Sequence, residues 1–175
     1  MRYRGMRLAV LLTAAVVATT TAQTKPDFSG DWSYDKSKST IVRVNNTNVD
    51  APALGIEFSA RQDATSLRVE RRFGSPPTAY TWVFDLTGKP TTNKLPGNNG
   101  DDEVVSTATW NGNKLVITST RMSTDAQGRK VATSSLKRTL SINGDGTLKI
   151  EASGTPPPIQ GTSKVTSLYR KAAQQ

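Results

Sequence analysis

The 175-residue sequence contains no cysteine and no histidine. Without histidine, the chain has no Ser-His-Asp triad, no Cys-His pair and no imidazole general base. Without cysteine, it has no disulfide, no thiolate nucleophile, no zinc site of the usual Cys/His kind and no lipid attached to a cysteine. No other catalytic motif takes their place. The sequence therefore favours a non-catalytic protein, without deciding the question, and predicts no metal and no cofactor.

Apolar and aromatic residues are also scarce. Hydrophobic residues make up 35% of the chain, and its aromatic residues are three Trp, four Tyr and four Phe. The length suits a single domain that folds around one core. Because the small apolar fraction limits the size of a dry core, it favours a polar or open interior over a deep fatty-acid pocket.

The first 22 residues have the organisation of a secretory signal peptide. Arg2, Arg4 and Arg7 form a positively charged start, an apolar stretch covers 8–18, and small residues precede a cleavage site before Gln23. An apolar stretch of this length is too short to cross a membrane, which needs about 20 residues. The alternative is a buried helix at the N-terminus.

Cleavage at this site would divide the chain into a signal peptide, 1–22, and one domain, 23–175, that has no membrane span. Proteins exported from animal cells are commonly cross-linked by disulfides, which this chain cannot form. We therefore expect export to a bacterial periplasm or to the cell exterior.

The chain carries 23 basic and 14 acidic residues, a net charge of +9. Loss of the three arginines of the signal peptide leaves 20 basic residues and a net charge of +6. Nucleic-acid-binding proteins gather such charges into a stripe with aromatic residues between them. Only 68–72 and Lys137-Arg138 approach a cluster, and an alternating strand with a solvated charged face explains both. We predict no nucleic-acid partner.

From residue 28 onward, short segments alternate in polarity and are rich in β-branched and aromatic residues, as strands are. We expect nine strands, at 28–34, 56–61, 66–73, 79–86, 103–110, 114–123, 130–142, 147–153 and 163–171. Turns such as Asn111-Gly112-Asn113 and Asn143-Gly144-Asp145-Gly146 supply the positive φ angles that tight hairpins need. One helical turn is expected at 35–40.

Sequential hairpins with no second set of strands favour closure of one sheet on itself. The sequence therefore predicts an all-β protein, an antiparallel meander of about eight to ten strands closed into an up-and-down barrel. We expect it to be a monomer.

Alternation along the strands also predicts which side chains point into the barrel. Each buried aliphatic or aromatic side chain contributes about 1.5–3 kcal/mol, so the apolar faces select the strand register. Arg71 lies on the apolar face of its strand and is the polar group expected to meet an anionic ligand head. The predicted ligand-binding lining is Leu67, Val69, Arg71, Phe73, Tyr80, Trp82, Phe84, Leu115 and Ile117. The alternative is that these side chains only complete the core.

Residues 28–39, FSGDWSYDKSKS, resemble the opening strand of bacterial exported lipocalin-like proteins, whose pattern is FSGxWxxDxxKS followed by a run of hairpins. The hairpin at 108–117 and the closing strand at 167–171 are similar to the same group. The resemblance covers about residues 26–171 and implies a lipocalin-like barrel.

The resemblance also implies that Trp32 plugs one end of the barrel and that Arg170, from the final strand, packs over it. Gly30 would remove a side chain from the path of the tryptophan. An arginine over an indole face contributes about 0.5–2 kcal/mol. We expect Gly30, Trp32 and Arg170 to be structural rather than ligand-binding.

The predicted function is binding of a small hydrophobic or amphipathic molecule inside the barrel, since barrels of this size either fill with side chains or hold one small ligand. The rival is an interaction module of the cell envelope with a filled barrel, which would use Ser/Thr-rich strand faces and the stiff loop at 155–159. A third feature is Asp101-Asp102-Glu103, where an oxygen-rich loop suggests calcium but lacks the spacing of a helix-loop-helix site. The alternative there is a solvated loop that leads into a strand.

Overall fold

The computed structural model describes the parts of the chain that form the barrel. The described backbone covers 24–44, 47–50, 52–73, 78–97, 100–155 and 164–172, and the described side chains cover 24–42, 52–71, 79–95, 100–154 and 164–172. The predicted signal peptide and most of the proline-rich loop lie outside these residues. No helix in the described part is long and apolar enough to cross a membrane.

The prediction of an all-β antiparallel meander is confirmed. The strands are β1 (Gly30–Tyr34), β2 (Ile41–Val44), β3 (Thr47–Asp50), β4 (Glu57–Gln62), β5 (Ser66–Phe73), β6 (Thr78–Asp85), β7 (Thr91–Gly97), β8 (Gly100–Asn111), β9 (Lys114–Thr124), β10 (Lys130–Ile142), β11 (Leu148–Thr155) and β12 (Val165–Lys171). Ten of them form one sheet in the order β6-β5-β4-β1-β12-β11-β10-β9-β8-β7, and β2 and β3 form a separate hairpin. A short 3₁₀ helix, η1 (Lys36–Lys38), falls within the expected helical turn.

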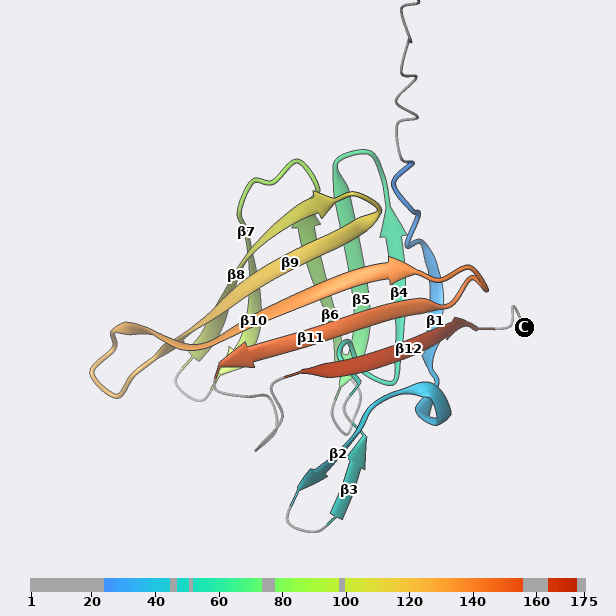
Figure 1. Cartoon of the computed structure of the whole chain (residues 1–175). Coiled ribbons are helices and arrows are strands. Elements are labelled where there is room, and N and C mark those ends of the chain that lie inside the picture. Colours follow the sequence, from blue (N-terminus) through green and yellow to red (C-terminus); the bar gives the residue numbers. More distant parts are fainter. Residues whose placement is uncertain are drawn as a thin grey trace, which may run out of the picture.

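The ten-stranded sheet curls into a nearly closed barrel, and its two edge strands, β6 and β7, meet at a seam (Figure 1). At this seam the side chain of Asn93, on β7, takes the place of a strand partner. The backbone N–H of Val83 donates to Asn93 Oδ1 at 2.9 Å, and Asn93 Nδ2 donates to the Val83 carbonyl at 3.0 Å. The amide therefore satisfies both backbone groups of one edge residue, which an open edge would leave to water.

The barrel has two different ends. At one end, which we call the plugged end, the connections between β4 and β5, β6 and β7, β8 and β9, and β10 and β11 are all short. The Asp63 carboxylate organises the first of them by accepting hydrogen bonds from the Ser66 hydroxyl and from the N–H groups of Thr65 and Ser66, which lowers the pKa of Asp63 to about 2. The other end, the cavity end, receives the turn at 125–129 and the segment that leads from β1 through η1 and the β2–β3 hairpin to β4.

Aromatic side chains fill the plugged end. Trp32 is 1% exposed, and its indole N–H donates to the Phe28 carbonyl at 2.9 Å. The Phe28 ring stacks on Trp110 with 6.0 Å between ring centroids. Gly30 has a φ of +138°, and a Cβ at this position would lie 3.3 Å from the Lys171 side chain. A glycine there leaves room for that lysine.

The structure corrects the expectation that Arg170 packs over Trp32. Lys171 places its Nζ 5.7 Å from the Trp32 ring centroid, whereas Arg170 pairs with Asp35 at 2.6 Å. The reason is strand alternation, because Lys171 is the residue paired with Trp32 in the ladder and shares its face, and Arg170 points the other way. The expected cation over the indole is present, one residue further along the chain.

Two parts of the fold were not predicted. The hairpin β2–β3 and the strand β7 lie in segments expected to be loops, and β7 carries few β-branched residues and a proline, Pro96, near its end. The acidic run 101–103 lies within β8 rather than in a loop. Its side chains therefore alternate between faces, and Asp102 alone of the three is buried.

Candidate ligand-binding cavity

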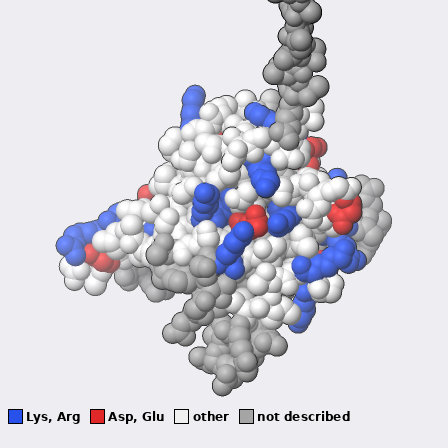
Figure 2. Space-filling model, viewed as in Figure 1, with Lys and Arg blue, Asp and Glu red and all other residues white. Residues whose placement is uncertain are grey.

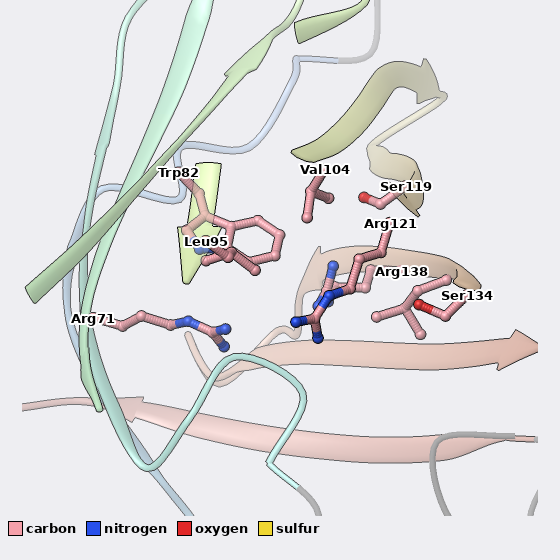
Figure 3. Close-up of a pocket in the computed structure, with 9 residues that line it drawn as sticks. Arg71, Trp82, Leu95, Val104, Ser119, Arg121, Ser134 and Arg138 are labelled. Atoms are coloured by element: carbon pink, nitrogen blue, oxygen red, sulfur yellow. The ribbon is translucent and has the colours of Figure 1, made fainter. Parts of the chain in front are cut away.

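A cavity of about 200 Å³ lies inside the barrel (Figure 3). It has both apolar and cationic walls. Its lining residues are Arg71, Trp82, Leu95, Val104, Ser119, Arg121, Ser134, Leu136 and Arg138.

Strand alternation and the direction of each strand explain where this cavity lies. On β9 the inward positions read Leu115, Ile117, Ser119 and Arg121 from the plugged end to the cavity end. On β5 they read Leu67, Val69 and then Arg71. The order on β10 is Leu140, Arg138, Leu136 and Ser134 in the same direction. On each strand the inward residues are apolar near the plugged end and include charged or hydroxyl groups toward the cavity end.

Two arginines and one tryptophan form the centre of the cavity. The Arg71 and Arg138 guanidinium carbons lie 5.0 Å and 5.4 Å from the Trp82 ring centroid. Arg138 and Trp82 are each only 5% exposed. Figure 3 shows Arg71 entering from the opposite side to Arg138, with the nitrogens of both turned toward the space between them.

Burial is the main influence on the charge of both arginines. It lowers the pKa of Arg138 to about 10. Burial also lowers the pKa of Arg71 to about 10, and the neighbouring positive charge of Arg138 acts in the same direction. Both groups stay charged at neutral pH, so the interior holds two like charges close together in a site of low polarity.

A third arginine, Arg121, is already compensated. Its Nε donates to Asp102 Oδ2 at 2.6 Å, and its Nη2 contacts the same oxygen. Burial of Asp102 opposes its ionisation, but the hydrogen bonds of Arg121 and Ser123 and the charges of Arg121 and Lys130 together hold the pKa of this carboxyl below its usual value. Arg121 is half exposed and contributes little free positive charge to the interior.

Two hydrogen-bond donors in the cavity have no partner among the described residues. They are the indole N–H of Trp82 and Nη1 of Arg138, and both atoms are buried. Buried donors are nearly always paired, and leaving one unpaired costs about 1–3 kcal/mol, more for a charged group. Acceptor atoms that reach these two donors from the cavity would remove this cost.

The segment 52–56, which joins β3 to β4, lies across the interior beside this site. The Ala53 N–H donates to Ser167 Oγ at 3.0 Å, and the Leu54 N–H donates to the Tyr169 hydroxyl at 3.0 Å. Arg138 Nε donates to the Ala53 carbonyl at 3.3 Å. Leu54 is buried in the core, so the segment covers apolar surface and fixes one edge of the Arg138 guanidinium.

The structure separates the predicted ligand-binding residues into two groups. Arg71 and Trp82 line the cavity. Five others are packed in the filled core: Leu67, Val69, Phe84, Leu115 and Ile117. Tyr80 is half-buried and packs against that core, and the side chain of Phe73 lies outside the described residues.

Sequence reasoning missed Arg138, although a signal for it exists. Arg138 occupies the same face of its strand as Leu136, Leu140 and Ile142, just as Arg71 shares a face with Val69. Lys137-Arg138 was instead assigned to the solvated charged face of an alternating strand. Leu95 was missed because its strand was not predicted.

The other charged residues form no comparable site in the described part of the chain. No group of three or more His, Cys, Asp or Glu side chains there is placed to hold a metal ion. On the face seen in Figure 2, basic side chains are interleaved with acidic ones and do not form a continuous stripe.

A scan against models of known protein families finds no match for this chain, and a search of curated proteins finds no relative.

Proposed function

We propose that the protein is an exported, non-catalytic barrel that binds a small hydrophobic or amphipathic molecule in its interior. The single observation that carries the proposal is the cavity of about 200 Å³ between Arg71, Trp82 and Arg138. Protein interiors are normally packed without voids of this size. A concave, mostly apolar space with a few convergent polar groups is the usual form of a small-molecule site.

The distribution of packing supports the same proposal. The plugged end is closed by Phe28, Trp32 and Trp110, so stability does not require the remaining space to be filled. An interaction module with a filled barrel, the rival function, would have no reason to place charged side chains around an internal space. It would instead present an extended exposed apolar surface.

Binding is tested with 1-naphthylamine, a neutral two-ring probe whose fluorescence changes in apolar surroundings. Val104 and Val105 are neighbours on β8, and alternation turns Val104 into the cavity and Val105 to the opposite face. Saturable binding is expected for the natural sequence. Val104→Phe should weaken it by about tenfold or more, since a ring in the cavity removes the space that the probe would fill.

Val105→Phe is the matched control and should leave probe affinity within about twofold, because additions on the far face do not alter the cavity. Absence of saturable binding to the natural sequence, or equal loss in both variants, would contradict a binding site in the barrel interior.

We propose export on the basis of the N-terminal sequence and a lipocalin-like relationship on the basis of the motif at 28–39. The three arginines and apolar stretch of the first 22 residues support cleavage before Gln23, with delivery to the periplasm or the exterior. N-terminal sequencing of the protein recovered outside the cytoplasm should begin at Gln23. Recovery there of a chain that begins at Met1 would contradict this proposal.

A further inference from the structure

We propose that the ligand is an organic anion: a carboxylate on a compact apolar body, with the carboxylate held by Arg138 and Trp82. This inference rests on the proposed binding function and specifies the chemical class of the ligand. It follows from the charge of the cavity, from its two unpartnered donors and from its size.

The charge of the cavity favours an anion. Its lining contains three arginines and no acidic residue. Arg121 is neutralised by Asp102, but Arg138 forms no ion pair with any described residue. The guanidinium carbons of Arg71 and Arg138 both lie within 5.4 Å of the Trp82 ring centroid, and the charge of Arg138 opposes that of Arg71. A negative group between them would replace this repulsion with two attractions in a site where water screens little.

The two donors point to a carboxylate in particular. Trp82 Nε1 and Arg138 Nη1 are both buried and belong to residues that line the cavity, and the Arg138 guanidinium carbon lies 5.4 Å from the Trp82 ring centroid. A carboxylate has two acceptor oxygens in one plane and forms its strongest hydrogen bonds with charged donors. A neutral alcohol or amide would also satisfy a donor, but it would leave the arginine charge uncompensated.

The size and the remaining walls define the body of the ligand. Leu95, Val104 and Leu136 supply apolar surface beside the Trp82 ring. A volume of about 200 Å³ is slightly larger than a cavity of about 150 Å³ that accommodates benzene. It is smaller than sites for drug-sized molecules, which begin near 300 Å³. One or two fused rings or a short chain therefore fit better than a long fatty acid.

The experiment compares 2-naphthoate with 2-naphthamide, which has the same shape and no charge, by calorimetry at pH 7. The natural sequence should bind naphthoate about 10- to 100-fold more tightly than naphthamide, the range expected for hydrogen bonds to a charged group. Arg138→Met should remove this preference while naphthamide affinity changes little. Arg61→Met, which removes an exposed arginine from the outer face of β4, is the matched control and should retain the preference.

A second variant tests the other donor. Trp82→Phe keeps an aromatic wall and deletes the indole N–H, and it should weaken naphthoate binding several-fold more than naphthamide binding. Retained affinity for 1-naphthylamine shows in each variant that the cavity is intact.

The outcomes separate this inference from the binding function. Equal affinity of the natural sequence for the two ligands, with both sensitive to Val104→Phe, would overturn the anion assignment and leave the binding function standing. A naphthoate preference that survives in Arg138→Met would overturn the assignment of the carboxylate to this arginine. Binding of the neutral probe alone, with neither 2-naphthoate nor 2-naphthamide bound, would also overturn the inference.

Discussion

The two ends of the barrel use one sheet for opposite purposes. At the plugged end, Phe28 precedes β1 and packs with Trp32 of β1 and Trp110 of β8. At the cavity end, two other strands, β5 and β10, turn Arg71 and Arg138 inward around a space. Strand alternation governs both ends. The difference comes from which residue types occupy the inward positions and from the stagger between the strands.

This difference shows how a small protein can keep charged groups inside. Burying a charged side chain without a partner is costly, and the folded state tolerates it only when other interactions supply enough stability. The filled core that includes Leu115, Ile117 and Ile150 supplies that stability next to the plug. The two buried arginines should therefore make the cavity end less stable than the packed core beside it.

The largest expected effect is at the plugged end. Trp32→Ala should lower the free energy of unfolding by about 3–5 kcal/mol, because it removes a buried indole and leaves a cavity that the barrel cannot collapse around. Urea denaturation followed by circular dichroism measures the change. Trp32→Phe, which keeps an aromatic ring and loses the hydrogen bond to Phe28, should cost less than half as much.

The same variant sharpens the comparison between the ends. In the folded fraction of Trp32→Ala, affinity for 1-naphthylamine should fall by less than about tenfold, since Trp32 does not line the cavity but shares Phe58 with Arg71 as a ladder partner. A large loss of affinity would mean that the two ends form one cooperative unit.

Much of the fold was predictable from local patterns. Strands with period-two alternation, such as 66–73 and 114–123, were identified because apolar and polar residues alternate in their first halves and β-branched residues are common along them. Strand β7 was not, because its residues show no apolar alternation; it is held by pairing with β8 and by the amide of its own Asn93 at the seam. Such pairing depends on closure of the barrel, which is a property of the whole sheet.

The site was only partly predictable. Alternation correctly turned Arg71 inward, but it does not say where along a strand the packed core ends and a cavity begins. Leu115 and Ile117 therefore looked equivalent to Trp82, although they lie in the filled part of the barrel. The stagger between strands decides this, since it brings Arg138 of β10 opposite Arg71 of β5 across the interior.

A smaller effect of opposite sign is expected at the cavity end. Arg138→Met should raise the free energy of unfolding at pH 7 by about 1–2 kcal/mol, because it replaces a buried charge with an apolar side chain of similar length. The lost hydrogen bond to the Ala53 carbonyl, which is long at 3.3 Å, offsets part of the gain. Urea denaturation measures the change in the free energy of unfolding. The control is Arg61→Met, which alters an exposed side chain and should change this free energy by less than about 0.5 kcal/mol.

The sign of this result decides what the arginine is for. A gain in stability together with loss of the naphthoate preference would mean that the fold sustains an unfavourable charge, which a bound anion relieves. A loss in the free energy of unfolding of more than about 1 kcal/mol, comparable to breaking a buried hydrogen bond, would instead mean that Arg138 stabilises the segment 52–56. In that case the cavity end would be built for stability, as the plugged end is, and the contrast between the two ends would fail.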